Sequence, residues 1–297
     1  MTLTVDLGQS GNRIRVGDIS LQSTRPKRAG EEPVDALRAI FEQTQQLTSD
    51  VVALSCTGFN GIVSNPQPFL QLCHEFFGAT KVAVMDDGLA GFIGALAGRN
   101  GVALTIGGGV VAVGGRDKKF AHRDGLGSIF GDEGSGFWLG KNAITKALGI
   151  RQGRGEDQDL VVAFKKNLQQ FDELTMKNGA DAVTLAIESA QNLLNAADAG
   201  IKTAIEIRSE GAFLLGQTVI ATWLGAGGKI DESPEITIQG GPARNASYVK
   251  LIQENIAAVI AHASFVQPLG DNLDGAQWIA ENMTEDAAPL LLWGTTD

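Results

Sequence analysis

The chain has 297 residues, a hydrophobic fraction of 43% and a charged fraction of 20%, values typical of a globular protein with one large domain or two ordinary ones. No apolar run approaches the ~20 residues of a transmembrane helix, which argues against a membrane-spanning protein. A net charge of −10 and a pI near 4.8 argue against nucleic-acid binding, because that function depends on clustered Lys and Arg.

The first residues, "MTLTVDLG", carry neither the basic nor the apolar region of a secretory signal, so we expect a cytoplasmic location. Cys56 and Cys73 have the spacing of neither a C-x-x-C pair nor a metal knuckle, which predicts buried thiols without a disulfide framework. The histidines also lack metal-binding spacing. We therefore expect His74, His122 and His262 to be structural or surface residues.

The first hundred residues alternate strand-like and helix-like segments. An apolar run at 3–8 ends in a glycine turn, and 14–23 has the pattern of the returning strand of a hairpin. This alternation indicates an α/β fold. The further segments expected here are helices at 34–47, 68–77 and 88–98 and strands at 51–55 and 82–85.

A second unit begins near Gly101 and repeats the opening order of strand, glycine turn and strand. The repetition predicts a duplicated two-domain architecture with a cleft between the halves. We expect domains at 1–100 and 101–270, with a C-terminal helical segment, 271–297, packing back on the first. The segments expected after residue 100 are strands at 101–106, 107–115, 118–125 and 235–241 and helices at 137–148, 158–171, 181–224 with a break at Gly200, 246–263 and 272–282.

Two glycine turns, "DLGQSGN" (6–12) and "TIGGGVV" (105–111), follow strands in corresponding places. Without side chains, their N–H groups could approach an anion, and two facing turns could clamp the phosphates of a nucleotide. Neither turn matches G-x-x-x-x-G-K-[ST], and no G-x-G-x-x-G joins a strand to a helix, so the Walker and Rossmann interpretations fail. Taken alone, each turn is more typical of a plain hairpin.

Two pairs of neighbouring carboxylates are candidates for chemistry. Asp132 and Glu133 lie between glycines in "SIFGDEGSGFWLG" (128–140), although acidic residues before a helix usually only cap it. Asp86 and Asp87 follow a strand and could be an ordinary turn pair. A glycosidase also needs two carboxylates, but the sequence shows no aromatic cluster to bind its sugar.

The order of these motifs resembles the N-acetylglucosamine kinase and BadF/BadG-type ATPase family, within the actin-like ATPase and sugar kinase superfamily. The resemblance runs from residue 4 to about residue 280, and "GDEGSGFW" is its most specific part. It implies an α/β fold of two actin-like (ribonuclease H-like) ATPase domains with a nucleotide and sugar cleft between them. The segments that carry it are 6–8, Asp87, "VALTIGGGVVAVGG" (102–115), "DGLGSIFGDEGSGFWLGKNAI" (124–144) and "QGGPARN" (239–245).

The resemblance further implies an ATP-dependent kinase that phosphorylates the 6-hydroxyl of an amino sugar such as N-acetylglucosamine. Asp87 would be the catalytic base, and Asp132 would accept hydrogen bonds from two sugar hydroxyls. Asp6 would help to hold Mg²⁺, through water. The substrate-binding set is Asp132, Gly58, Gly131 and Glu133, and ATP would be bound by Asp6, Gly8, Gln9 and Ser10, by Gly107, Gly108 and Gly109, and by Gly240, Gly241 and Asn245. The expected partner is a small sugar. The family resemblance also implies that two copies of the chain could form a homodimer.

The sequence departs from the family pattern at both phosphate loops. Leu7, Gln9 and Gly11 stand where a run of Gly with Thr or Ser is usual. Gly108 and Val110 replace the two hydroxyl residues of the second loop. Either turnover is weak or the backbone alone suffices.

Two alternatives remain open. The first is the ATPase activator of a 2-hydroxyacyl-CoA dehydratase or benzoyl-CoA reductase, for whose iron–sulfur cluster two cysteines are too few. The second is a sugar- or nucleotide-sensing protein that binds without turnover.

Overall fold

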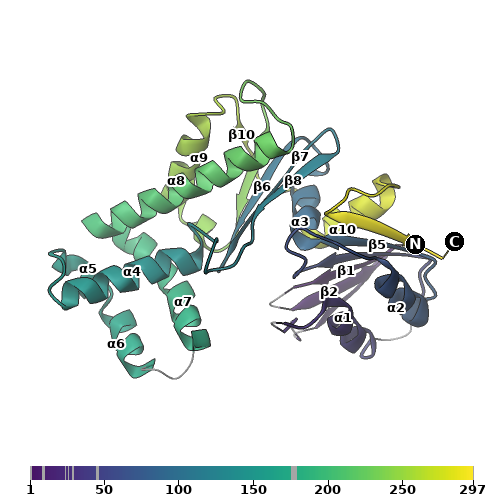
Figure 1. Ribbon diagram of the computed structural model, residues 1–297, viewed down its shortest axis with the longest axis horizontal. Coiled ribbons are helices and arrows are strands. Elements are labelled where there is room, and N and C mark those ends of the chain that lie inside the picture. The colour runs from purple at the N-terminus through teal and green to yellow at the C-terminus, as the bar shows by residue number, and fades with distance from the viewer. Residues whose placement is uncertain are drawn as a thin grey trace.

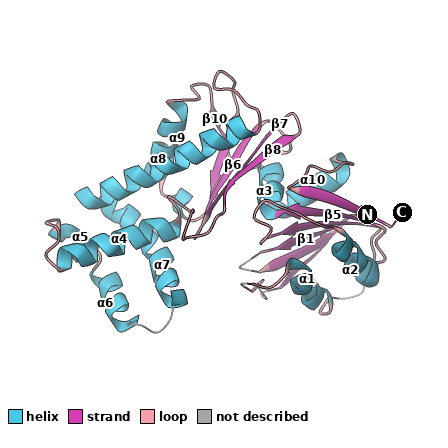
Figure 2. Ribbon diagram, viewed as in Figure 1, coloured by secondary structure: helices cyan, strands magenta, loops and turns pink. Residues whose placement is uncertain are grey.

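The computed structural model describes residues 2–8, 11–23, 25, 27–28, 30–44, 47–174 and 179–296. It contains two mixed β-sheets, each with helices packed against it, in two halves that lie next to each other (Figure 1). The longest helices belong to the half that contains the second sheet (Figure 2). None of the helices in the described part of the chain combines the length and apolarity that a bilayer crossing requires.

The first sheet has the strand order β11-β5-β4-β1-β2-β3. Strands β1, β4 and β5 are parallel, whereas β2, β3 and β11 are antiparallel to their neighbours. Helices pack against this sheet, and one of them comes from the C-terminal end of the chain. The elements are β1 (Thr2–Leu7), β2 (Asn12–Val16), β3 (Ile19–Ser23), α1 (Pro33–Phe41), β4 (Val51–Cys56), α2 (Gln67–Phe77), β5 (Lys81–Asp86), α3 (Asp87–Leu96), α10 (Asn272–Asn282) and β11 (Leu291–Thr295).

The second sheet has the order β10-β9-β6-β7-β8, which repeats the order of the first without its added edge strand. In both sheets an antiparallel hairpin flanks a parallel pair, so the duplication expected from the sequence is present in the topology. The elements are β6 (Gly101–Ile106), β7 (Val110–Arg116), β8 (Lys119–Asp124), α4 (Gly136–Arg151), α5 (Gln158–Ala163), α6 (Lys165–Leu174), α7 (Gly179–Asp198), α8 (Lys202–Gly225), β9 (Glu235–Gln239), η1 (Pro242–Arg244), α9 (Ala246–Ala257) and β10 (Ser264–Phe265).

The central strands are nearly continuous apolar runs because both of their faces are covered. In β1, β4 and β5 every residue after the first is buried, which is the pattern of parallel strands between two helical layers. Each sheet has its own apolar core, and a third apolar cluster lies between α3, α10 and the two sheets. This third cluster joins the halves.

Helices α3 and α10 cross at two glycines with their backbones almost in contact. A Cβ atom on Gly94 would lie 2.0 Å from the carbonyl oxygen of Asp271, and one on Gly275 would lie 1.8 Å from that of Ala90. No side chain fits at either position. The crossing holds α10 against the first half, so that the chain continues into β11 beside β5.

Two helix predictions were too long, and a third helix is divided. Helix α1 ends at Phe41, where the Thr44 hydroxyl donates to its carbonyl at 2.7 Å and closes a turn. The predicted helix 158–171 is two helices separated at Phe164, whose side chain is fully buried. Helix α9 ends at Ala257, several residues before the predicted end.

Two further segments were each predicted as a single element and contain two. Segment 14–23 lies within two strands that reverse at Gly17, which has a φ of +53°. Segment 271–297 is helical only over α10, and its end is strand β11. The sequence "PLLLWGT" (289–295) is a short apolar run of strand length, and pairing with β5 selects the strand.

Replacing Gly94 with alanine is expected to lower the free energy of unfolding by at least ~2 kcal/mol, because the added methyl group can be accommodated only by separating the two helices. Urea denaturation measures the change. The matched control is Gly149→Ala in α4, where the nearest atom to a new Cβ is 4.0 Å away. That variant should be unchanged or more stable by up to ~1 kcal/mol, and equal midpoints for the two variants would contradict the close crossing.

Candidate active site

A pocket of about 470 Å³ lies between the two halves. The pocket is lined by the end of β5, the loop after β4, the β6–β7 turn, and the end of β8 with the loop that follows. Six residues predicted from the sequence line it together: Asp87, Gly58, Gly107, Gly108, Gly109 and Asp132. Its other lining residues were not among the predicted site residues; they are Thr57, Asn60, Asp86, Thr105, Val110, Val111, His122, Gly125 and Gly127.

Asp87 is the first residue of α3 and lies at the end of the parallel strand β5. Its carboxylate is partly exposed and is hydrogen bonded to Thr57 and to the backbone of Gly88. Burial and, to a smaller extent, the nearby charge of Asp86 raise the pKa of Asp87 to about 7, although these hydrogen bonds act in the opposite direction. The group can therefore take up or release a proton near neutral pH.

Asp86 has the structural role that the sequence left open for both members of the pair. Its Oδ1 accepts a hydrogen bond from the backbone N–H of Gly88 at 3.0 Å and so caps α3, and its Oδ2 accepts one from Gly61 at 2.9 Å. The side chain is 2% exposed. Because Asp86 makes these contacts, the carboxylate of Asp87 is not needed as the cap.

His122 extends from β8 of the second half toward this pair. Its Nε2 lies 3.7 Å from Oδ1 of Asp86, and its ring packs so closely on Gly61 that a Cβ there would be 3.0 Å from the ring. Burial lowers the pKa of His122 below its usual value. The expectation of an ordinary structural or surface histidine therefore missed a residue that lines the pocket from the opposite half; only its place at the end of β8, before a glycine turn, could have suggested it.

Asp132 contacts the second glycine turn. Its Oδ1 accepts a hydrogen bond from the backbone N–H of Val110 at 2.9 Å, and its own N–H donates to Asp124 at 2.8 Å. A Cβ on Gly109 would lie 2.8 Å from the same Oδ1, so glycine is required beside it. Burial raises the pKa of Asp132, against the opposing effect of the Val110 N–H. One carboxylate oxygen thus shapes the turn, and the hydrogen bonds predicted to two sugar hydroxyls would fall mainly to the other oxygen.

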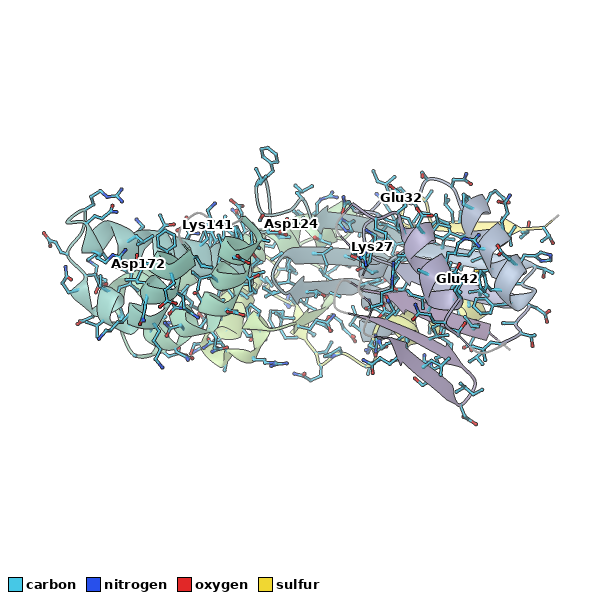
Figure 3. The ribbon with its side chains drawn as sticks, turned by 90° about the horizontal axis from the view of Figure 1, so that it is seen from below. Lys27, Glu32, Glu42, Asp124, Lys141 and Asp172 are labelled. Atoms are coloured by element: carbon cyan, nitrogen blue, oxygen red, sulfur yellow. The ribbon has the colours of Figure 1, made fainter. Side chains whose placement is uncertain are left out.

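The alternative role of the Asp132 pair as a helix cap is wrong. Helix α4 starts at Gly136 and is capped by Ser135, whose Oγ accepts a hydrogen bond from Trp138 N at 3.1 Å. Glu133 is exposed and, like Gly131, is not among the residues that line the pocket. Figure 3 labels Asp124, the acceptor for the Asp132 N–H, near the middle of the molecule.

Lys27 is a second residue that the sequence did not identify. A Cβ on Gly58 would lie 3.0 Å from both Cε and Nζ of Lys27, so the ammonium group rests on the backbone of a pocket residue. The Lys27 N–H also donates to the carbonyl of Gly8 at 3.3 Å. No motif surrounds this lysine, so only the folded chain brings its positive charge beside the acidic pocket.

The first glycine turn is described only in part, because Gln9 and Ser10 lie outside the described residues. Gly8 N donates to Gly11 O at 3.1 Å and closes the turn. Asp6, at the end of β1, is 8% exposed and is not among the residues that line the pocket. Both of its oxygens accept hydrogen bonds from protein groups, so the side chain does not fit the expected role as a magnesium ligand. Among the described residues, no group of three or more His, Cys, Asp or Glu could hold a metal ion.

The glycine turn at Gly240 and Gly241 borders a second pocket of about 330 Å³. This pocket shares Gly107 and Gly108 with the first pocket. Gly241 lines it, and Gly240, with a φ of +107°, packs against the carbonyl of Ile106. Its other lining residues are Gly136, Ile187, Glu188, Ala190, Gln191, Leu194, Pro242 and Arg244.

The expected contact of Asn245 with adenosine is not supported by its position. Its Oδ1 caps α9 by accepting a hydrogen bond from Tyr248 N at 2.8 Å, and its amide donates to Asp198 at 2.7 Å. Both ends of the side chain are therefore used within the protein. Arg244, its neighbour, lines the pocket instead.

Comparison with solved structures identifies the same two-domain fold in sugar kinases. A candidate N-acetylglucosamine kinase from Chromobacterium violaceum is 18% identical with a TM-score of 0.63, over 93% of this chain and 96% of that one. One from Porphyromonas gingivalis is 14% identical with a TM-score of 0.63, over 96% and 100%. A ROK family glucokinase from Streptomyces griseus, in complex with glucose and AMPPNP, is 18% identical with a TM-score of 0.56, over 94% and 99%.

No curated protein matches the sequence. The sequence model of one family matches residues 4–277, which is nearly the whole chain and includes both sheets except strand β11. The family resemblance and the actin-like fold expected from the motifs are confirmed. The chain belongs to the BadF/BadG/BcrA/BcrD ATPase family.

Proposed function

We propose that this chain is an ATP-dependent kinase that phosphorylates the 6-hydroxyl of an amino sugar, such as N-acetylglucosamine or a related hexosamine. The observation that carries the proposal is the position of Asp87, a carboxylate with a pKa of about 7, in one pocket with the second glycine turn. Such a group can accept the proton of a sugar hydroxyl while the backbone of Gly107 to Gly109 faces the phosphate to be transferred.

ATP would bind across the two pockets that share Gly107 and Gly108. The base and ribose would occupy the pocket that Arg244 and Gly241 line, and the terminal phosphate would reach the pocket of Asp87. Phosphoryl transfer depends mainly on positioning and charge neutralisation. N–H groups of the glycine turn and the ammonium of Lys27 would supply positive charge here, and Mg²⁺ would accompany ATP.

The two halves are proposed as the domains that close over the substrate, residues 1–100 with 271–297 and residues 101–270. The pocket lies between them, so closure would exclude water from the Asp87 carboxylate. Asp132 would then meet the sugar with the oxygen that Val110 does not use.

The burial of both cysteines argues against the activator with an iron–sulfur cluster. Cys56 and Cys73 are free and buried in the core of the first half. Burial raises the pKa of Cys73 to about 12 and that of Cys56 well above its usual value, so neither thiol is poised to ligate a metal at a surface. The sensor alternative differs from the kinase in turnover alone and is decided by the same assay.

Asp87→Asn is expected to reduce sugar-dependent ADP release by about 10²- to 10⁴-fold, because the amide cannot accept the proton. A coupled ADP assay with Mg-ATP and a panel of amino sugars measures the rate. Glu42→Gln is the control, since this exposed carboxylate lies outside the pocket (Figure 3), and its rate should stay within about twofold of wild type. Binding of ATP or sugar without any sugar-dependent release by the wild type would overturn the kinase and favour the sensor.

The rate should depend on pH through Asp87. Only the ionised carboxylate accepts a proton, so activity should be half-maximal near pH 7 and fall about tenfold per pH unit below it. Initial rates between pH 5 and 9, at saturating ATP and at sugar concentrations well below KM, report kcat/KM and so measure this limb for the sugar-free protein. A rate that stays flat down to pH 5 would exclude Asp87 as the base.

The same raised pKa predicts a stability effect that needs no substrate. The folded chain binds a proton at Asp87 below about pH 7, whereas the unfolded chain binds it only below its ordinary value of 3.8. The free energy of unfolding of the wild type, relative to Asp87→Asn, should therefore fall as the pH rises from 4 to 8, by on the order of 4 kcal/mol. Urea titrations of both proteins at several pH values test this, and a constant difference would contradict it.

A further inference from the structure

The Asp6 carboxylate is directly opposite Arg13 in the register of the β1–β2 hairpin. Its Oδ2 accepts two hydrogen bonds from Arg13, from Nη2 at 2.7 Å and from Nε at 3.2 Å. Its Oδ1 accepts one from Ser55 Oγ at 3.1 Å and one from Asn272 Nδ2 at 3.1 Å. Four protein donors thus surround one side chain.

These four hydrogen bonds occupy the acceptor sites of the Asp6 carboxylate. An ionised carboxylate offers about four lone-pair sites, and each is taken here by a protein donor. A metal ion, or a water molecule bound to one, needs one of those sites and would have to displace a donor. Both donors from Arg13 bond to Oδ2, and charge-assisted bonds of this kind are stronger than hydrogen bonds between neutral groups, so displacement there is costly.

Arg13 is itself held from the other side. Its Nη1 donates to Oδ2 of Asp271. Asp271 is the N-cap residue of α10. The guanidinium therefore bridges two carboxylates that would otherwise repel each other. Through Asp6, Ser55, Asn272 and Asp271 the bridge connects β1, β2 and β4 with the start of α10, where the chain returns from the second half to the first.

We propose that Asp6 is an anchoring residue for Arg13 and α10 and does not hold a metal ion in this chain. Arg13 provides the positive charge that a metal would bring to this carboxylate. The proposal concerns the ligands of Asp6 in the free protein, so it stands or falls independently of whether a sugar is phosphorylated.

The test is a titration of the nucleotide-free protein with Mn²⁺, in which electron paramagnetic resonance measures the concentration of unbound ion. Wild type and Asp6→Asn should bind Mn²⁺ equally, within about twofold. Arg13→Gln leaves the carboxylates of Asp6 and Asp271 close together without their cation, and should bind Mn²⁺ at least tenfold more tightly than wild type. The gain should disappear in the Asp6→Asn/Arg13→Gln double variant.

Arg15→Gln is the matched control. Arg15 lies on the same strand and contacts the same helix, through Asp274 at 2.9 Å and Gln277 at 3.1 Å, but it does not contact Asp6. This variant removes an arginine from the interface between β2 and α10 and should show no gain in Mn²⁺ affinity.

Two outcomes would overturn the proposal. One is a saturable Mn²⁺ site in the wild type that Asp6→Asn removes while circular dichroism reports an unchanged fold. The other is a folded Arg13→Gln variant that binds Mn²⁺ no better than wild type. If Arg13→Gln does not fold, Arg13→Met decides the question: it also removes the positive charge but keeps a long unbranched side chain, so a gain is expected, and none would overturn the proposal.

Discussion

The close approach of α3 and α10 is the constraint on which the rest of the structure depends. Two glycines let the helix backbones touch, and no other residue fits at Gly94 or Gly275. The contact fixes α10, so the segment after it can add strand β11 to the first sheet. It also fixes α3, whose first residue is Asp87. One steric requirement therefore sets both how the halves join and where the candidate base lies.

The pocket between the halves gathers buried negative charge, and the structure separates the roles of its carboxylates by their hydrogen bonds. Asp86 is buried, and each of its carboxylate oxygens accepts a hydrogen bond from a backbone N–H group. Asp87 has fewer such donors and a raised pKa. Both residues line the pocket, but the oxygens of Asp86 are engaged by the helix cap and by Gly61, whereas Asp87 is the carboxylate with the raised pKa.

At both phosphate loops, where the sequence departs from the family pattern, an aspartate is hydrogen bonded to other groups of the protein. Residues 107–110 of the second turn carry no hydroxyl side chain, but the carboxylate of Asp132 holds this segment by accepting a hydrogen bond from the Val110 N–H. The aspartate of the first turn is likewise used inside the protein, by Arg13 and its partners. In both turns a carboxylate bonds to protein groups, which leaves phosphate recognition to backbone N–H groups and to cations such as Lys27.

The sequence alone determined the α/β class, the duplication and the glycine turns, because buried strands and tight turns leave local patterns of apolar residues and glycine. It also predicted that Asp87, Asp132 and the turn at Gly107 to Gly109 belong to one site. It could not assign His122 or Lys27, nor the internal partners of Asp6 and Asn245, since these contacts join residues far apart in the chain. Strand β11 escaped prediction for the same reason: a short apolar run becomes a strand only when an open sheet edge is available to pair with it.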